Sequence, residues 1–312
     1  MRRTKKTLAL TLSVATLALG LQACSTYPAE TETAVASASE FVPTGEGPAL
    51  WKVADEDTTI YLFGTVHALP SDIDWNSGPV KMALDSSQSL VTEIDMTPET
   101  TAAMGQMVMG KAMLPEGQTL RGLMTDEQKA TYEAGLAKLG VPPQALDRLE
   151  PWLASISLTQ VMMQKAGITG ENGVEKVLES IVPEGTERGS LETVEFQLDI
   201  FDSLPLDKQM TYLIEGIEKQ DEGMAMLTKL IDEWKVGNVE ELGGMLREVA
   251  ESDPVLAERL FYARNANWAA WIDERLDAPG TVFMAVGAGH LAGDKSVQDY
   301  LAERNISVTR LQ

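Results

Sequence analysis

Segments with the character of β-strands lie at both ends of this chain, and nearly everything between them has helical spacing. Residues 49–64 form two apolar runs around a polar turn at 55–57, and residues 281–286 and 308–311 have strand patterns near the other end. An isolated strand cannot bury its apolar side chains, so the terminal segments are expected to pair in one sheet. The sequence therefore predicts an α/β fold: a single sheet built from N- and C-terminal strands, with a large helical insertion.

The insertion, from about residue 98 to 277, carries apolar residues at three- and four-residue intervals. Two further strands are predicted, one at residues 89–95 with carboxylates at its end and one around 187–193. Helices are predicted at residues 126–139, 151–166, 206–234, 254–276 and 294–304. Together these elements predict one α/β domain over residues 49–312.

The amino terminus has the pattern of a targeting segment. Four basic residues precede an apolar run at 8–21, which has the length of a signal-peptide core and is too short to span a bilayer permanently. The run ends in Leu21-Gln22-Ala23-Cys24, which resembles the bacterial lipoprotein box. That resemblance implies a signal peptide over residues 1–23 and a lipid anchor on Cys24; the alternative is a plain secretory signal with an incidental cysteine.

Residues 24–48 are small, polar and acidic, and are expected to form a flexible tether. The resulting hypothesis is a protein of the bacterial cell envelope, lipid-anchored to the membrane and facing the periplasm. Ser25 follows the cysteine where an aspartate is associated with inner-membrane retention in some bacteria, so the outer membrane is the predicted location.

The charge and the cysteine count exclude several classes of function. The chain has 25 Lys and Arg against 47 Asp and Glu, and removal of the four basic residues of the signal takes the net charge from −22 to −26. A surface this acidic argues against nucleic acid as a partner and against strongly anionic substrates. The chain has one cysteine, which excludes an intramolecular disulfide and a cysteine-based zinc cluster.

The two histidines of the chain stand in matching positions. Each ends a Gly-x-x-His motif directly after an apolar strand: Gly64-Thr65-Val66-His67 and Gly287-Ala288-Gly289-His290. With 25 glycines in 312 residues, chance would seldom place one three residues before both histidines. A glycine at a strand end permits a tight turn, and ligands of open α/β sheets bind beyond the carboxyl ends of the strands. We therefore expect both imidazoles at one rim of the sheet.

Acidic residues at the end of a nearby strand are candidate partners for these histidines. Glu93 and Asp95 close the predicted strand 89–95, and the two-residue period places them on one face. Two histidines and a carboxylate are a recurring metal-ligand set, whereas a histidine oriented by a carboxylate is the arrangement of a general base. Both readings stay open for Glu93, and Asp95 is predicted to contact substrate.

Several blocks of the chain are similar to the TraB/GumN family, which is related to Tiki membrane proteases and to erythromycin-esterase-like proteins. The resemblance rests on the paired Gly-x-x-His turns and on the strand that ends in Glu93, and it extends over residues 49 to 312. It also includes these stretches: Pro151-Trp152, Gly173-Val174-Glu175, Glu192 to Gln197, Phe201 to Pro205, and Arg264-Asn265 with Trp268.

The resemblance implies a site formed by His67, Glu93 and His290, with Arg264 and Asn265 as substrate-binding residues. The Tiki-type members look like metal-dependent peptidases, so the implied cofactor is a divalent metal ion, Mn²⁺ or Co²⁺, held by the same three residues. Members of such a family share a fold more often than they share an activity.

Three functions remain as hypotheses at this point. The first is a metal-dependent hydrolase of amide or ester bonds, in which the metal activates water, or Glu93 acts as general base if it is not a ligand. The second is a protein that binds and sequesters a peptide or small molecule without turnover. The third is a metal-free esterase with a histidine as general base. The expected partners are the membrane, through Cys24, and a peptide or small-molecule substrate.

Overall fold

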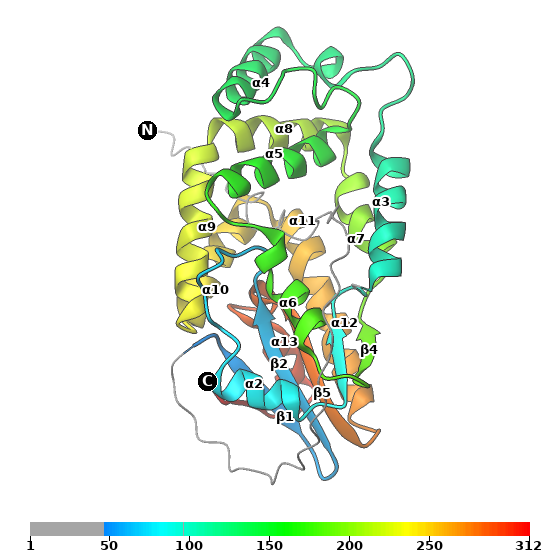
Figure 1. The fold of residues 1–312 in the computed structure, drawn as a ribbon, viewed down its shortest axis with the longest axis vertical. Coiled ribbons are helices and arrows are strands. Elements are labelled where there is room, and N and C mark those ends of the chain that lie inside the picture. The colour runs from blue at the N-terminus through cyan, green and yellow to red at the C-terminus, as the bar shows by residue number, and fades with distance from the viewer. Residues whose placement is uncertain (1–46, 96) are drawn as a thin grey trace, which may run out of the picture.

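The computed structural model describes residues 47–95 and 97–312, and a six-stranded sheet lies at one end of the molecule (Figure 1). The strands are ordered β4-β3-β5-β2-β1-β6 across the sheet. Their bounds are β1 Leu50–Ala54, β2 Thr58–Thr65, β3 Ser89–Thr92, β4 Glu187–Ser190, β5 Gly280–Gly287 and β6 Val308–Arg310. The first and last strands of the chain therefore share one sheet, which confirms the predicted fold class.

Four neighbouring strands, β4, β3, β5 and β2, run parallel, while β1 is antiparallel to both β2 and β6. The strand β5 lies between β2 and β3, so a strand from the carboxy-terminal part of the chain completes the centre of the sheet, while the last strand, β6, lies at its edge. Parallel strands end at a common edge, and this edge faces the helical part of the molecule (Figure 1).

Helices cover both faces of the sheet, and the alternation along β5 shows why. Val282, Met284 and Val286 pack against α12 (Ala263–Arg275) and α13 (Val297–Glu303). The intervening residues, Phe283 and Ala285, face the other side. Four helices supply most of the helical part of the core on that side: α2 (Gly78–Asp85), α6 (Val174–Ile181), α9 (Gln220–Lys235) and α10 (Val239–Ser252).

The remaining long helices form a second layer beyond the carboxyl ends of the parallel strands (Figure 1). These helices are α3 (Pro98–Ala112), α4 (Asp126–Leu139), α5 (Pro151–Lys165), α7 (Val194–Asp202) and α8 (Leu206–Glu218). Two hydrophobic clusters lie mainly among these helices, and Met163 of α5 also belongs to the core on the sheet. The space between the two layers is where the candidate site lies.

Two predicted long helices are interrupted in the structure. The predicted helix 206–234 is two helices, α8 and α9, because Lys219 leaves helical geometry with φ −104° and ψ 20°. The predicted helix 254–276 consists of α11 (Pro254–Ala257), a π-helical turn (Glu258–Tyr262) and α12. The spacing of apolar residues did not reveal the π-helical turn. Its one extra residue changes the direction in which the neighbouring side chains point.

Two other boundaries differ from the predicted ones. The strand predicted at 89–95 ends at Thr92, whose hydroxyl donates to the carbonyl oxygen of Ile94, so the chain bends at Glu93 and Ile94, before Asp95. The helix predicted at 294–304 begins at Val297, because Lys295 has a positive φ of 59° and Ser296 caps the helix with Asp299.

No helix within residues 47–95 and 97–312 is long and apolar enough to cross a membrane. The predicted signal peptide, Cys24 and nearly all of the predicted tether lie outside the described residues.

Candidate functional site

The two Gly-x-x-His turns leave the sheet side by side. In the parallel pair of β2 and β5, Gly64 is opposite Val286 and Thr65 is opposite Gly287. A Cβ atom on Gly64 would lie 3.1 Å from the Cα atom of Ala288, so a larger residue would push the two turns apart. His67 and His290 line one pocket as a result, as their matched positions predicted.

Glu93 directly follows β3 and reaches the same place from the other side of β5. Its carboxylate is buried, and its oxygens have separate partners. Oε1 accepts the backbone N–H of Gly287 at 2.7 Å, and Oε2 accepts Nε2 of Gln197 at 2.9 Å and Nη2 of Arg264 at 2.5 Å. Burial alone would raise the pKa of Glu93, but Arg264, the two histidines and the N–H of Gly287 together outweigh it and hold the pKa far below its usual range. Glu93 is therefore a permanent carboxylate.

Arg264, on α12, connects Glu93 to a second buried carboxylate. Nε and Nη2 of Arg264 donate to the two oxygens of Glu192 at 2.8 and 2.9 Å. Nη1 donates to the carbonyl oxygen of Leu260 at 2.8 Å and contacts Nε2 of His290 at 3.2 Å. With the contact to Glu93, each of the five N–H groups of the guanidinium has a partner. Arg264 therefore has no N–H left for a substrate carboxylate.

His290 is buried, and its surroundings keep it neutral. Asn265 donates to the carbonyl oxygen of Lys295 at 2.7 Å, so its Oδ1 accepts the proton on Nδ1 of His290 at 2.5 Å. Nε2 then carries the lone pair, 3.7 Å from Oε1 of Glu93. Burial, followed by the charge of Arg264, lowers the pKa of His290 well below its usual value.

His67 has the opposite character. Its Nδ1 lies 2.6 Å from Oε1 of Glu175, and Thr65 donates its hydroxyl to the same carboxylate oxygen. Burial opposes protonation of His67, but the carboxylates of Glu175 and Glu93 outweigh it and raise its pKa to about 9. With Nδ1 occupied, Nε2 points toward the Gly287 turn: a Cβ atom on Gly287 would lie 3.6 Å from it and 3.2 Å from Oε1 of Glu93.

The loop before α6 is built against His67, which explains how Glu175 is placed. Val174 donates its N–H to the carbonyl oxygen of Val66 at 3.0 Å, at the first turn of α6. A Cβ atom on Gly173 would lie 2.1 Å from the carbonyl oxygen of His67, so this position requires glycine. Glu175 in the first turn of the helix therefore has a defined position under the imidazole.

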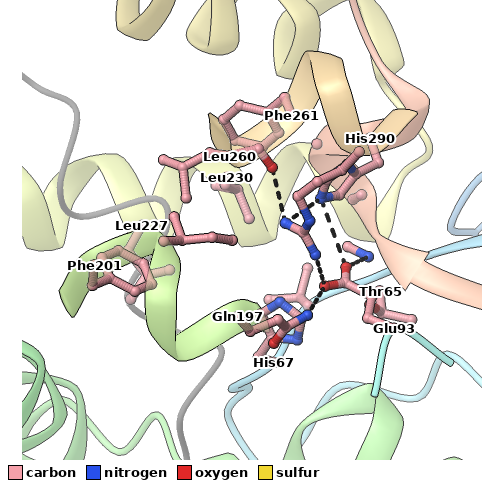
Figure 2. A pocket seen from close by; sticks show the side chains of 16 residues that line it. Thr65, His67, Glu93, Gln197, Phe201, Leu227, Leu230, Leu260, Phe261 and His290 are labelled. Atoms are coloured by element: carbon pink, nitrogen blue, oxygen red, sulfur yellow. Dashed lines mark hydrogen bonds and ion pairs between the residues drawn. The ribbon is translucent and has the colours of Figure 1, made fainter. Parts of the chain in front are cut away.

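A cavity of about 80 Å³ opens over these residues, and its lining is divided by polarity. Figure 2 shows Glu93, His290, His67 and Gln197 gathered on one side and apolar side chains on the other. The apolar wall comes from α7, α9 and the π-helical turn, and comprises Ile200, Phe201, Leu227, Leu230, Leu260 and Phe261. A cavity with convergent polar groups on one side and an apolar wall on the other is typical of a ligand site.

The TraB/PrgY/gumN family model matches residues 49–310, which is most of the chain and all of the residues that form this pocket. The chain belongs to this family. No curated protein and no solved structure matches the chain in the corresponding comparisons. Family membership agrees with the observed fold and assigns no chemistry to the site.

The predicted site residues of this family member do not all reach the pocket. His67, Glu93, Arg264 and His290 line it, and Asn265 lies behind His290 as its hydrogen-bond partner. The structure places Asp95 elsewhere: its carboxylate accepts from Thr97 and Thr100 at the start of α3, and it does not line the pocket. The turn after Thr92 separates Asp95 from Glu93.

Sequence reasoning did not identify three residues that complete the polar cluster: Glu175, Glu192 and Gln197. Glu192 binds Arg264 and accepts the indole N–H of Trp268 at 3.0 Å, and Gln197 donates to both Glu93 and Glu192. All three lie in stretches that resemble the family. That resemblance was the available signal, because a single carboxylate among 47 acidic residues has no distinguishing pattern.

The arrangement of the cluster bears on the predicted metal ion. His67 and His290 each have Nδ1 bonded to an oxygen and Nε2 turned inward, as metal-bound imidazoles commonly have. However, Arg264 occupies Oε2 of Glu93 and contacts Nε2 of His290, and within the described residues no three His, Cys, Asp or Glu side chains form a metal-ligand set. As arranged, these residues do not fit a metal ion, and the metal stays a prediction.

Proposed function

We propose that this protein is a hydrolase of amide or ester bonds in which the two histidines divide the proton transfers. The observation that carries the proposal is the difference between their partners in one pocket: Nδ1 of His67 contacts the carboxylate of Glu175, whereas His290 lies between the amide of Asn265 and the guanidinium of Arg264, and their pKa values shift in opposite directions accordingly. Pairs of titratable groups whose surroundings push their pKa values apart provide one acid and one base at the same pH. At neutral pH His67 is an imidazolium and His290 is a neutral imidazole.

In the proposed reaction, His290 acts on water. Its Nε2 lone pair faces the gap of 3.7 Å to Oε1 of Glu93, and its contact with Arg264 at 3.2 Å is the longest that the guanidinium makes. A water molecule that replaces this contact gives its proton to Nε2 while its oxygen attacks the carbonyl carbon of the substrate. Asn265 keeps the proton on Nδ1 and so fixes which nitrogen is the base.

His67 completes the reaction as the general acid. Its positive charge stabilises the oxygen that becomes negative when water adds to the carbonyl. Nε2 then donates its proton to the nitrogen or oxygen of the leaving group as the bond to carbon breaks. The proton taken up by His290 returns to solvent and His67 is reprotonated, so the cycle consumes one water and needs no other reactant.

This assignment predicts a bell-shaped dependence of kcat/KM on pH. Activity requires neutral His290, so it is lost as pH falls through a pKa well below 6.5. It also requires protonated His67, so it is lost as pH rises through about 9. The measurement is the hydrolysis of a p-nitroanilide and a p-nitrophenyl ester of the same apolar acyl group over this range, with and without EDTA.

The Glu175→Gln variant tests the role of His67. A neutral amide cannot stabilise the imidazolium as a carboxylate does, so the alkaline limb should move to lower pH while the acid limb stays in place. An alkaline limb that does not move would contradict the role of His67. Activity that disappears in EDTA and returns with Mn²⁺ or Co²⁺ would support the metal-dependent hydrolase instead, and binding without turnover would support a sequestering protein.

We also propose that the enzyme works in the bacterial cell envelope, periplasm-facing and anchored to the outer membrane by a lipid on Cys24. The proposal rests on the lipoprotein-like pattern at Leu21 to Cys24 and on an acidic chain that anionic headgroups would repel. Labelling with a radioactive fatty acid in a bacterial host should mark the full chain and not the Cys24→Ala variant. Equal labelling of both would contradict the anchor.

A further inference from the structure

The apolar wall of the pocket faces the reacting groups directly, which has a consequence for the substrate. Phe201 and Ile200 come from α7, Leu227 and Leu230 from α9, and all four line the cavity that His67 and His290 line. Figure 2 shows Phe201, Leu227 and Leu230 across the cavity from Glu93 and His290. A group bound beside the reacting carbonyl therefore contacts hydrocarbon on that side.

The polar side of the pocket is unsuited to an anionic group. Three carboxylates, Glu93, Glu175 and Glu192, lie in the cluster, and Arg264 is already paired with two of them. The N–H groups of Arg264 all have partners in the protein, so an anionic group of a substrate would find no free N–H there. An uncharged apolar group is the one that both sides of the cavity accommodate.

A second, smaller cavity of about 10 Å³ lies behind this wall, and Phe201 lines both. The residues around the second cavity are mainly apolar, with Trp152, Ile156, Leu204 and Tyr212 in the same hydrophobic cluster as Phe201. Phe201 is 5% exposed. Phe201 is therefore a buried residue that borders both apolar spaces.

We infer that the pocket takes a substrate whose reacting amide or ester carries an aliphatic chain or an aromatic ring, and that Phe201 limits the length of that group. This inference rests on the proposed hydrolase for its reaction. A chain that extends along the apolar wall gains contact with each methylene until it reaches Phe201, and a longer chain must displace the ring or remain in water.

The test is a homologous series of N-acyl p-nitroanilides, from acetyl to dodecanoyl. In the wild type, kcat/KM should rise about fourfold for each added methylene, the factor for burial of a CH₂ group, and then stop rising at one chain length. In Phe201→Ala the two cavities join, and the optimum should move to acyl chains about three carbons longer. Phe201→Leu leaves a smaller gap and destabilises the fold less, and it should move the optimum chain length by about one carbon.

Leu204→Ala is the matched control. Leu204 is a buried member of the same cluster and lines the second cavity but not the first, so its truncation enlarges that cavity and leaves the wall in place. The optimum in this variant should equal that of the wild type. An unchanged optimum in both Phe201 variants, or an equal shift in Leu204→Ala, overturns the inference.

Failure of the inference can be told from failure of the proposed hydrolase. If the wild type cleaves none of the anilides and none of the matching p-nitrophenyl esters, the hydrolase proposal fails. The same chain lengths are then measured by calorimetry as N-alkylacetamides, for which binding alone is needed. A binding optimum that lengthens in Phe201→Ala or Phe201→Leu supports the inference, and binding without any dependence on chain length overturns it.

Discussion

Replacement of His67 by Gln should lower kcat/KM by about 10²- to 10⁴-fold, the contribution of a positioned general acid or base. Glutamine retains a polar group in the position of the ring but has no proton to donate at neutral pH. The side chain of His67 is 21% exposed and packs outside the hydrophobic clusters, so the fold should persist. The measurement is kcat/KM for the anilide and the ester, with circular dichroism and thermal unfolding as checks on the fold.

The His290→Gln variant should lose activity to a similar extent, because water then has no base. If the two histidines act as one unit, the double variant should be no slower than the slower single variant. Lys81→Gln is the control: Lys81 pairs with Asp85 in an exposed i,i+4 ion pair on α2 and lies outside the pocket lining, so activity should not change. A His67→Gln enzyme that keeps more than about a tenth of the activity would contradict the acid–base assignment.

Replacement of Arg264 by Leu should lower the free energy of unfolding by about 3–5 kcal/mol, the cost of removing one partner from a buried ion pair. The side chains of Arg264, Glu93 and Glu192 are each 6% exposed, so the variant leaves two buried carboxylates without their cation. Urea denaturation near pH 7 measures the difference. Activity should fall as well, because Arg264 contacts both Glu93 and His290.

Arg304→Leu provides the matched control for Arg264→Leu. Arg304 pairs with Asp273 at 2.8 Å, but these side chains are 40% and 47% exposed, and such pairs are worth at most about 1 kcal/mol.

The loss of stability in Arg264→Leu should also depend on pH. Arg264 lowers the pKa of Glu93, so in the wild type this pair stabilises the fold above the usual carboxyl range and loses its effect as pH falls. The difference in free energy of unfolding between the two variants should therefore become smaller as pH falls. Equal losses of stability near pH 7 would contradict a buried network.

Patterns that repeat along the chain were sufficient for most of the fold. The apolar runs at 49–64 and 281–286 predicted strands that share a sheet, and β2 and β5 are indeed neighbours. Glycine before each histidine predicted turns at strand ends, and both turns meet at Gly64 and Ala288. These inferences succeeded because strand ends and turn residues are local properties. The prediction of a single helix over 206–234 failed because the break falls at Lys219, while the nearest glycines, Gly216 and Gly223, lie inside the two helices.

The partners of the site residues could not be read from local patterns. Glu175 lies 108 positions from His67, and its contact depends on a loop that packs against the carbonyl oxygen of that histidine. Asp95 was grouped with Glu93 because a strand was assumed to continue through both, and the turn after Thr92 separates them. Arg264 was expected to bind substrate, whereas its N–H groups are all directed to groups of the protein.

By itself the sequence determined the α/β class, the membership of the two terminal strands in one sheet, and the convergence of two histidines, since each follows from periodicity and from where strands end. The tertiary structure decided the chemical state of those histidines. A pKa depends on burial and on charges brought close by the fold, and here the carboxylate of Glu175 raises that of His67 while burial and Arg264 lower that of His290. The two histidines of matching Gly-x-x-His motifs thus differ in pKa because their neighbours in space differ.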